Sequence, residues 1–82
     1  MNTTYTKNHI FETSTLPKKP SFPLPHYLEE SIDNLIAAIK ANRIFLIPLY
    51  EEQVRADSRG LSDPAQEAWV IDYYHGRGWL SD

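Results

Sequence analysis

Residues 28–54 read LEESIDNLIAAIKANRIFLIPLYEEQV, and this segment governs the architecture of the whole chain. In its first half, large aliphatic residues recur at the i, i+4, i+7, i+8 and i+11 positions, a spacing that gathers them in one stripe along a helix. The stripe consists of Leu28, Ile32, Leu35, Ile36 and Ile39. Because such a stripe must be covered, the rest of the chain is expected to pack over it as further helices.

The first helix is predicted to begin near His26 or Tyr27, directly after the last proline, and to end near Ala41. Asn42 suits the left-handed position that closes many helices. Two alternatives stay open for residues 44–47. They form an extended connector, with Pro48 in the first turn of a second helix, or the helix starts earlier and the proline kinks it.

Two further helices complete the predicted body. Residues 51–59 read as helix, with Gly60 as a left-handed glycine at the end. Asp63 and Pro64 then supply a cap and a first-turn proline for a third helix, which runs until Gly76. The connection between these helices is short, so they are expected to pack as an antiparallel hairpin. The predicted fold is all-α, a small three-helix bundle over residues 26–82.

Residues 1–25 form a separate N-terminal arm. Residues 17–25 contain four prolines, which exclude a helix and favour an extended polyproline II course. Two roles stay open for the arm: it straps the helical body through Phe22 and Leu24, or it reaches a partner.

The composition limits the classes of function. The chain has 82 residues and no cysteine, so it has neither disulfides nor a thiolate metal site, and this fits a reducing compartment. The N-terminus lacks the basic and apolar regions of a signal peptide, and no apolar run is long enough to span a bilayer. The sequence therefore predicts a cytoplasmic protein without a membrane segment.

Charge is distributed unevenly. Residues 1–26 carry three lysines against Glu12, a formal charge of +2, whereas residues 27–82 carry five basic and ten acidic residues, a formal charge of −5. Because phosphate binding needs clustered lysine and arginine, an acidic body argues against nucleic acid as a direct ligand.

The residues of a catalytic or metal centre are not grouped in the sequence. His9, His26 and His75 are scattered, and none has the spacing of a metal site. No histidine is placed by sequence to activate a serine. We therefore expect no metal, no cofactor and no enzymatic activity.

An aromatic cluster is the sharpest functional signal. Trp69, Tyr73, Tyr74 and Trp79 fall within eleven residues, and tryptophan and tyrosine are over-represented at binding hot spots. Trp69 is expected mainly in the core, whereas Tyr74 and Trp79 are expected to lie partly outside it. Glu51 and Glu52 are expected on the adjoining acidic surface. These six residues form the predicted partner-binding site.

Leu49-Tyr50, the turn Arg59-Gly60-Leu61-Ser62 and Tyr73-Tyr74 carry a resemblance. Over about residues 44–75, the chain resembles uncharacterised small helical proteins of bacterial phages and mobile elements, but Pro48 and the Gly78-Trp79 end depart from that pattern. The resemblance implies a helical hairpin and a mobile-element setting, and it supplies no catalytic residue. Small proteins of that setting often bind and inhibit a host protein, as anti-defence proteins do.

The predicted function follows from these features. The chain is expected to be a protein-binding regulator or inhibitor that occludes a functional surface of a host protein, such as a defence or nucleic-acid-processing protein. The alternative is a structural or assembly subunit without enzymatic activity that self-associates, for example as a homodimer, through the run from Ile44 to Tyr50.

Overall fold

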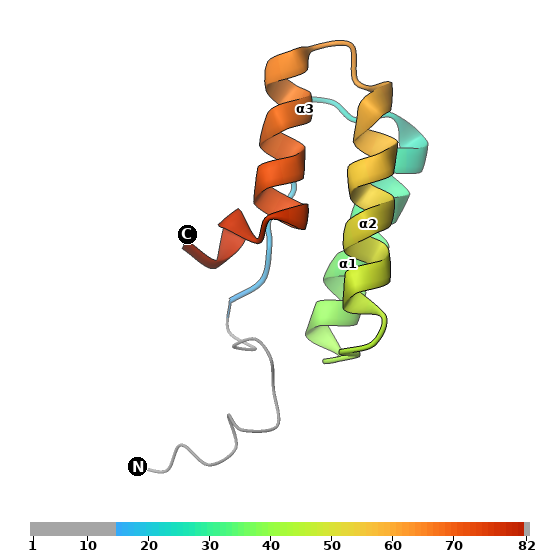
Figure 1. Ribbon diagram of the computed structural model, residues 1–82, viewed down its shortest axis with the longest axis vertical. Coiled ribbons are helices and arrows are strands. Elements are labelled where there is room, and N and C mark those ends of the chain that lie inside the picture. The colour runs from blue at the N-terminus through green and yellow to red at the C-terminus, as the bar shows by residue number, and fades with distance from the viewer. Residues whose placement is uncertain (1–14, 82) are drawn as a thin grey trace.

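The computed structural model describes residues 15–81, which form three helices and the extended segment that precedes them (Figure 1). The helices are α1 (His26–Lys40), α2 (Ile47–Asp57) and α3 (Pro64–Val70), and α3 continues into a π-helical turn, Ile71–His75. Short 3₁₀ turns, Ser58–Gly60 and Gly78–Ser81, complete the described elements. The predicted all-α bundle is therefore confirmed for this part of the chain.

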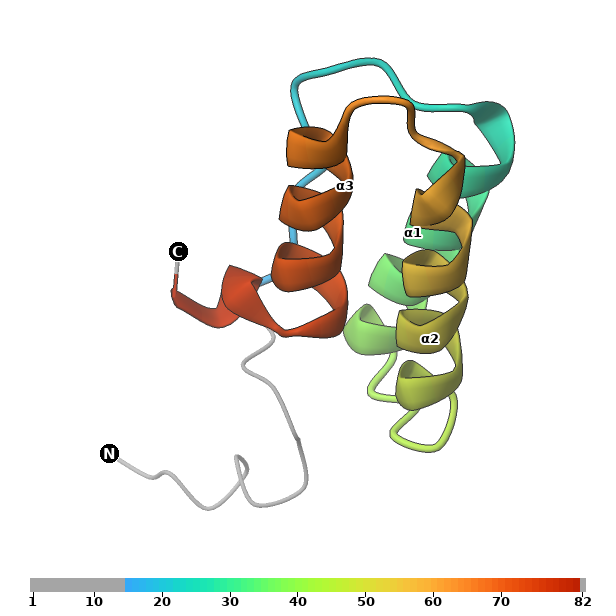
Figure 2. The same ribbon diagram turned by 45° about the horizontal axis from the view of Figure 1, so that its top comes forward.

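The apolar stripe of α1 lies at the centre of the bundle. α1 packs mainly against α2, and α2 in turn packs against the π-helical turn. Figures 1 and 2 show α2 and α3 side by side and antiparallel, as the short connection between them predicted. The buried core consists of Leu28, Ile32, Leu35, Ala38, Ile39, Ile47, Val54, Val70, Tyr73, Tyr74 and Trp79. The stripe is therefore buried in one core with residues of α2 and of the segment from Val70 to Trp79, and of the stripe residues Ile36 alone is partly exposed.

The end of α1 is closed by Asn42, as the sequence predicted. Asn42 has a φ of 55°, its N–H donates to the carbonyl of Ile39 (3.0 Å), and the N–H of Arg43 donates to the carbonyl of Ala38 (2.9 Å). These two bonds are those of a Schellman motif. They reverse the chain sharply and hold the connection to α2 in a fixed geometry.

Residues 44–47 do not form an extended connector, so this part of the first alternative was wrong. The N–H groups of Leu46 and Ile47 both donate to the carbonyl of Arg43, at 2.9 and 3.1 Å, which closes a turn. α2 begins at Ile47 with Pro48 in its first turn, where the missing N–H of proline costs no helical hydrogen bond.

Gly60 does not adopt the left-handed conformation, so its predicted role was also wrong. None of the glycines in residues 15–81 has a positive φ, and α2 is instead followed directly by the 3₁₀ turn Ser58–Gly60. The reason for glycine is steric, because the hydroxyl of Tyr27 lies where a Cβ on Gly60 would be. The glycine allows the start of α1 to approach the end of α2.

The third helix starts as predicted. The carboxylate of Asp63 accepts a hydrogen bond from the N–H of Ala65 (2.9 Å), and Pro64 occupies the first turn. The π-helical turn at its other end was not predicted. Gly76 follows this turn without left-handed geometry, and Arg77, with a φ of 61°, redirects the chain.

The extended segment, residues 15–25, packs against the bundle. Pro17 is buried, and Leu16, Phe22 and Leu24 pack partly buried against the core. Figure 2 shows the segment passing α3 and crossing the end of the bundle to reach α1. For residues 15–25 the strap interpretation of the arm is therefore correct, while the rest of the arm, residues 1–14, lies outside the described residues.

Candidate functional site

Four aromatic rings form a continuous cluster on α3 and the extended segment. Trp69 stacks on Tyr73 with ring centroids 4.5 Å apart, and Tyr74 meets both rings edge-on. Phe22 of the extended segment packs edge-on against Trp69 at 5.8 Å. Trp69 and Tyr73 lie four residues apart, about one helical turn, and Tyr73 and Tyr74 both belong to the π-helical turn.

The two tyrosine hydroxyls hold one residue of the extended segment. The N–H of Lys18 donates to the hydroxyl of Tyr73 (3.0 Å), and the hydroxyl of Tyr74 donates to the carbonyl of Lys18. Burial raises the pKa of Tyr74 above its ordinary value of 10.0, with a smaller contribution from Tyr73 and Asp33. Tyr74 therefore stays a neutral hydrogen-bond donor at neutral pH, and the pair anchors the segment to the bundle.

The side chain of Lys19 fastens the same segment to α1. Its ammonium group lies 2.7 Å from the carboxylate of Asp33 and 3.3 Å from that of Glu29. The hydrogen bond to Asp33, and then that to Glu29, raise the pKa of Lys19. Both helices that flank the segment thus hold it, α3 through tyrosine hydroxyls and α1 through carboxylates.

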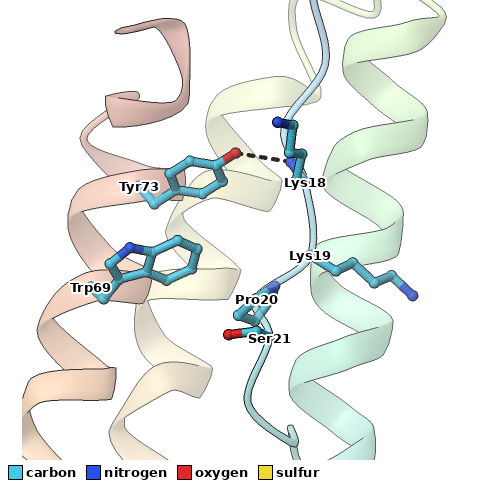
Figure 3. A pocket seen from close by; sticks show the side chains of 6 residues that line it. All are labelled: Lys18, Lys19, Pro20, Ser21, Trp69 and Tyr73. Atoms are coloured by element: carbon cyan, nitrogen blue, oxygen red, sulfur yellow. Dashed lines mark hydrogen bonds between the residues drawn. The ribbon is translucent and has the colours of Figure 1, made fainter. Parts of the chain in front are cut away.

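A hollow of about 470 Å³ lies between the extended segment and the aromatic pair (Figure 3). It is lined by Lys18, Lys19, Pro20, Ser21, Trp69 and Tyr73. The segment touches α3 on both sides of it, at Lys18 and at Phe22. Figure 3 shows the Lys19 side chain directed towards α1, so this ammonium group does not point into the hollow.

Glu51 serves an internal ion pair. Its carboxylate accepts two hydrogen bonds from the guanidinium of Arg77, at 2.8 and 3.2 Å, and its side chain is nearly fully buried. The hydrogen bond to Glu51 raises the pKa of Arg77. This pair links α2 to the turn after α3, so the expectation that Glu51 contributes acidic surface is wrong.

Glu52 is exposed, as expected, and lies beside Arg55 and His75. It accepts hydrogen bonds from the guanidinium of Arg55, and its carboxylate lies 3.4 Å from the imidazole of His75. The hydrogen bond to Arg55 lowers the pKa of Glu52, and charge attraction to Arg55 and His75 adds to the effect.

The predicted order of exposure among the aromatic residues was reversed. Tyr74 and Trp79 are fully buried and Tyr73 is nearly so, whereas Trp69 is 40% exposed. Of the six predicted partner-binding residues, only Trp69 and Glu52 present substantial surface. Hence these six residues do not form one continuous exposed surface in this structure.

A different apolar surface lies at the connection between α1 and α2. Phe45 is 85% exposed, Leu49 is 64% exposed and Ile44 is 41% exposed, although all three are large apolar residues. We call Ile44, Phe45 and Leu49 the apex patch. The run from Ile44 to Tyr50 was identified in the sequence as a possible self-association segment, but the periodicity did not show which of its residues point outward.

The turn geometry explains why these residues are exposed. The bonds that close the Arg43 turn direct Leu46 and Ile47 into the bundle, and Phe45 and Leu49 lie about one helical turn apart on the outside. Two hollows of about 290 and 280 Å³ lie at the same connection, and Ile44 and Phe45 line the larger of the two. The hollows are lined by Asn42, Arg43, Ile44, Phe45 and Leu46, and by Asn34, Ala37, Ala38, Arg43, Leu46 and Tyr50.

In residues 15–81, no group of three or more histidine, aspartate or glutamate side chains is arranged to hold a metal ion. No helix in the same range has the length and apolar character needed to cross a bilayer.

Comparison of the chain with protein-family models, with curated proteins and with solved structures finds no match. The evidence for function therefore comes from the surfaces of this chain.

Proposed function

We propose that this chain is a small regulator that binds a protein partner and inhibits it by covering a functional surface. The observation that carries the proposal is the apex patch, where three large apolar side chains within residues 44–49 are exposed. Exposed apolar clusters of this kind mark interaction surfaces more often than chance, because water contact with them is unfavourable. We therefore assign partner binding to the apex patch and not to the aromatic residues that the sequence predicted for it.

Rigidity at the patch supports a binding role. The Schellman motif at Asn42 and the double hydrogen bond to the carbonyl of Arg43 fix the backbone on both sides of Phe45. A backbone that is already held in place loses little conformational freedom on binding, which favours affinity. Occlusion needs no catalytic group, and it suits a chain of 82 residues.

The proposal also includes a bacterial host and a cytoplasmic location. The resemblance to small proteins of phages and mobile elements supports a target in a bacterial host, such as a defence or nucleic-acid-processing protein, and the absence of cysteine supports a cytoplasmic location. The choice of the apex patch as the binding surface depends neither on the host nor on the location.

Site-specific crosslinking tests the proposal. A photoreactive phenylalanine analogue is placed at position 45 of the full chain, and at position 80 as a control, because Leu80 is also exposed but lies on the last 3₁₀ turn. In a bacterial lysate, we expect one discrete protein adduct from position 45 and none from position 80. The activity of the captured protein should fall when the wild-type chain is added, and not when the Phe45→Ala/Leu49→Ala variant is added. Equal adducts from both positions, or equal inhibition by both chains, would reject the proposal.

The second candidate is a self-associating assembly subunit. The observation that favours it is the hollow of about 290 Å³ that Ile44 and the protruding Phe45 help to line, because a protrusion beside a hollow can pair with the same surface of a second copy. Light scattering on the isolated chain separates the candidates: a stable dimer that the Phe45→Ala/Leu49→Ala variant disrupts supports assembly, and a monomer supports the regulator.

A further inference from the structure

The cations beside the apex patch define the chemistry of its partner. Lys40 lies in the last turn of α1 and Arg43 in the connection that follows, and both are exposed. Neither forms an ion pair with another residue of the described range, 15–81. Arg43 lines the hollow beside Ile44 and Phe45, and Lys40 precedes it by three residues, so two cations without an ion-pair partner in residues 15–81 lie at the connection that carries the apex patch.

The rest of α1 has the opposite charge. Its first two turns carry Glu29, Glu30 and Asp33, of which Glu29 and Asp33 are engaged by Lys19. The protein as a whole has a formal net charge of −3, so the basic character at the apex runs against the overall charge. Electrostatic complementarity selects partners and orients them, and here it selects a negative partner surface.

From the apolar patch and its basic border, we propose that the apex binds an acidic amphipathic helix, that is, a partner segment with an apolar stripe flanked by glutamate or aspartate. This inference rests on the proposed function, and it names the chemistry of the partner at the same site. The apolar stripe covers Phe45 and Leu49, and its side chains enter the adjoining hollow that Ile44 and Phe45 line. The flanking carboxylates pair with Lys40 and Arg43.

Charge also argues against the two other occupants of such a surface. In a two-fold dimer, Lys40 and Arg43 of both copies would meet at one seam, and four like charges there oppose association. For an anionic bilayer, two basic residues contribute only about 1 kcal/mol each, and the acidic body is repelled by the same surface. An acidic helix avoids the like-charge seam, and it can contact the apex without facing the whole acidic body as a bilayer would.

Peptide display tests the inference directly. The probe is a library of 16-residue helical peptides in which the apolar stripe is fixed and each flanking position carries glutamate, lysine or glutamine. The library is selected on the full wild-type chain and depleted on the Phe45→Ala/Leu49→Ala variant, which should stay folded because both side chains are exposed. We expect glutamate to be enriched at the flanking positions.

A pair of charge variants then locates the effect. Lys40→Glu/Arg43→Glu should weaken the best selected peptide by at least about tenfold, as the loss of two complementary contacts implies. The control, Lys18→Glu/Arg59→Glu, makes the same change in net charge at two exposed cations away from the patch. It should change the affinity by less than about twofold, because screening weakens distant charges.

Each remaining outcome overturns the inference in a recognisable way. Enrichment of lysine or glutamine, no enrichment, or equal weakening by both charge variants would reject an acidic helix as partner. A dimer disrupted by Phe45→Ala/Leu49→Ala would assign the patch to a second copy. Binding to phosphatidylserine vesicles that the same variant abolishes would assign it to a membrane. If position 45 still crosslinks one inhibited protein in any of these cases, the proposed function stands and only the partner chemistry is wrong.

Discussion

Tyr73 and Tyr74 satisfy both backbone polar groups of Lys18, one hydroxyl acting as acceptor and the other as donor. Both tyrosines belong to the π-helical turn. Lys18 belongs to no helix, yet its backbone N–H and carbonyl both have hydrogen-bond partners at a partly buried position. Buried backbone polar groups require such partners.

Tyr74→Phe removes one of these bonds and keeps the ring. The carbonyl of Lys18 loses its hydrogen-bond donor while the packing of the aromatic cluster is preserved, so we expect the free energy of unfolding to fall by about 1–2 kcal/mol. Urea unfolding measures the change. Tyr50→Phe is the matched control, because Tyr50 is half-buried and its hydroxyl forms no hydrogen bond within residues 15–81; equal effects of the two substitutions would contradict the anchoring role.

The same residue gives a pH dependence with a defined sign. The pKa of Tyr74 is raised in the folded state, so its neutral form is favoured by folding. This contribution is fully present below the unfolded-state pKa of about 10.0 and is lost as the pH rises above that value towards the folded pKa. We expect wild-type stability to fall more steeply than that of Tyr74→Phe above pH 10, as measured by unfolding at a series of pH values. Parallel curves would show that Tyr74 is not the group responsible.

Adjacent glutamates should respond differently to the same substitution. Glu51→Gln removes a buried carboxylate that binds Arg77 through two hydrogen bonds, and we expect a loss of about 1–2 kcal/mol. The loss stays below that of a fully buried pair, because the Arg77 side chain is 38% exposed and water screens the interaction. Glu52→Gln, at an exposed pair, should leave the denaturation midpoint unchanged, and equal effects would refute the assignment of Glu51 to the interior.

The helix boundaries show which features a sequence alone can predict. The starts of α1 and α3 and the left-handed Asn42 depend on nearby residues, namely the preceding proline, the Asp63 cap and the short asparagine side chain, and all three were predicted. The close approach of Tyr27 to Gly60 was missed because it joins two different helices. Local signals therefore account for the starts of α1 and α3 and for the end of α1, whereas the packing at the end of α2 depends on a distant residue.

The site was harder to predict for the same reason. Whether Trp69 or Trp79 is exposed depends on the π-helical turn and on the extended segment, neither of which has a local sequence signal of its own. The pairing of Glu51 with Arg77 joins residues 26 positions apart. Likewise, the run from Ile44 to Tyr50 was identified as a candidate surface, but the turn at Arg43 decides which of its side chains face outward.

Replacing Asn42 tests the connection between α1 and α2. At a φ of 55°, alanine places its Cβ against the backbone, whereas glycine does not. We therefore expect Asn42→Ala to be less stable than Asn42→Gly by about 1 kcal/mol, as measured by thermal unfolding. The apex patch adds a second readout, since the less rigid connection should also weaken capture from position 45. Equal stabilities would mean that the left-handed position does not hold this turn.

The extended segment, residues 15–25, is an integral part of the packed structure. It fills the space between α1 and α3, with backbone bonds to tyrosines on one side and ion pairs from Lys19 on the other. Small bundles bury little apolar surface, so partly buried residues of this segment are a substantial part of the core. The helices and residues 15–25 are therefore expected to unfold together.

A double substitution in this segment tests that cooperation. Phe22→Ala/Leu24→Ala removes two apolar side chains that pack on the core without belonging to any helix, and we expect a loss of about 2–3 kcal/mol, less than for fully buried residues. The measurement is the urea midpoint of the helical circular dichroism signal, with Ser21→Ala as the exposed control in the same stretch. If the segment is part of the cooperative unit, the helical signal is lost at lower urea although no helical residue was changed. An unchanged helical midpoint would mean that the bundle is stable without these contacts, and the segment would then be a displaceable strap.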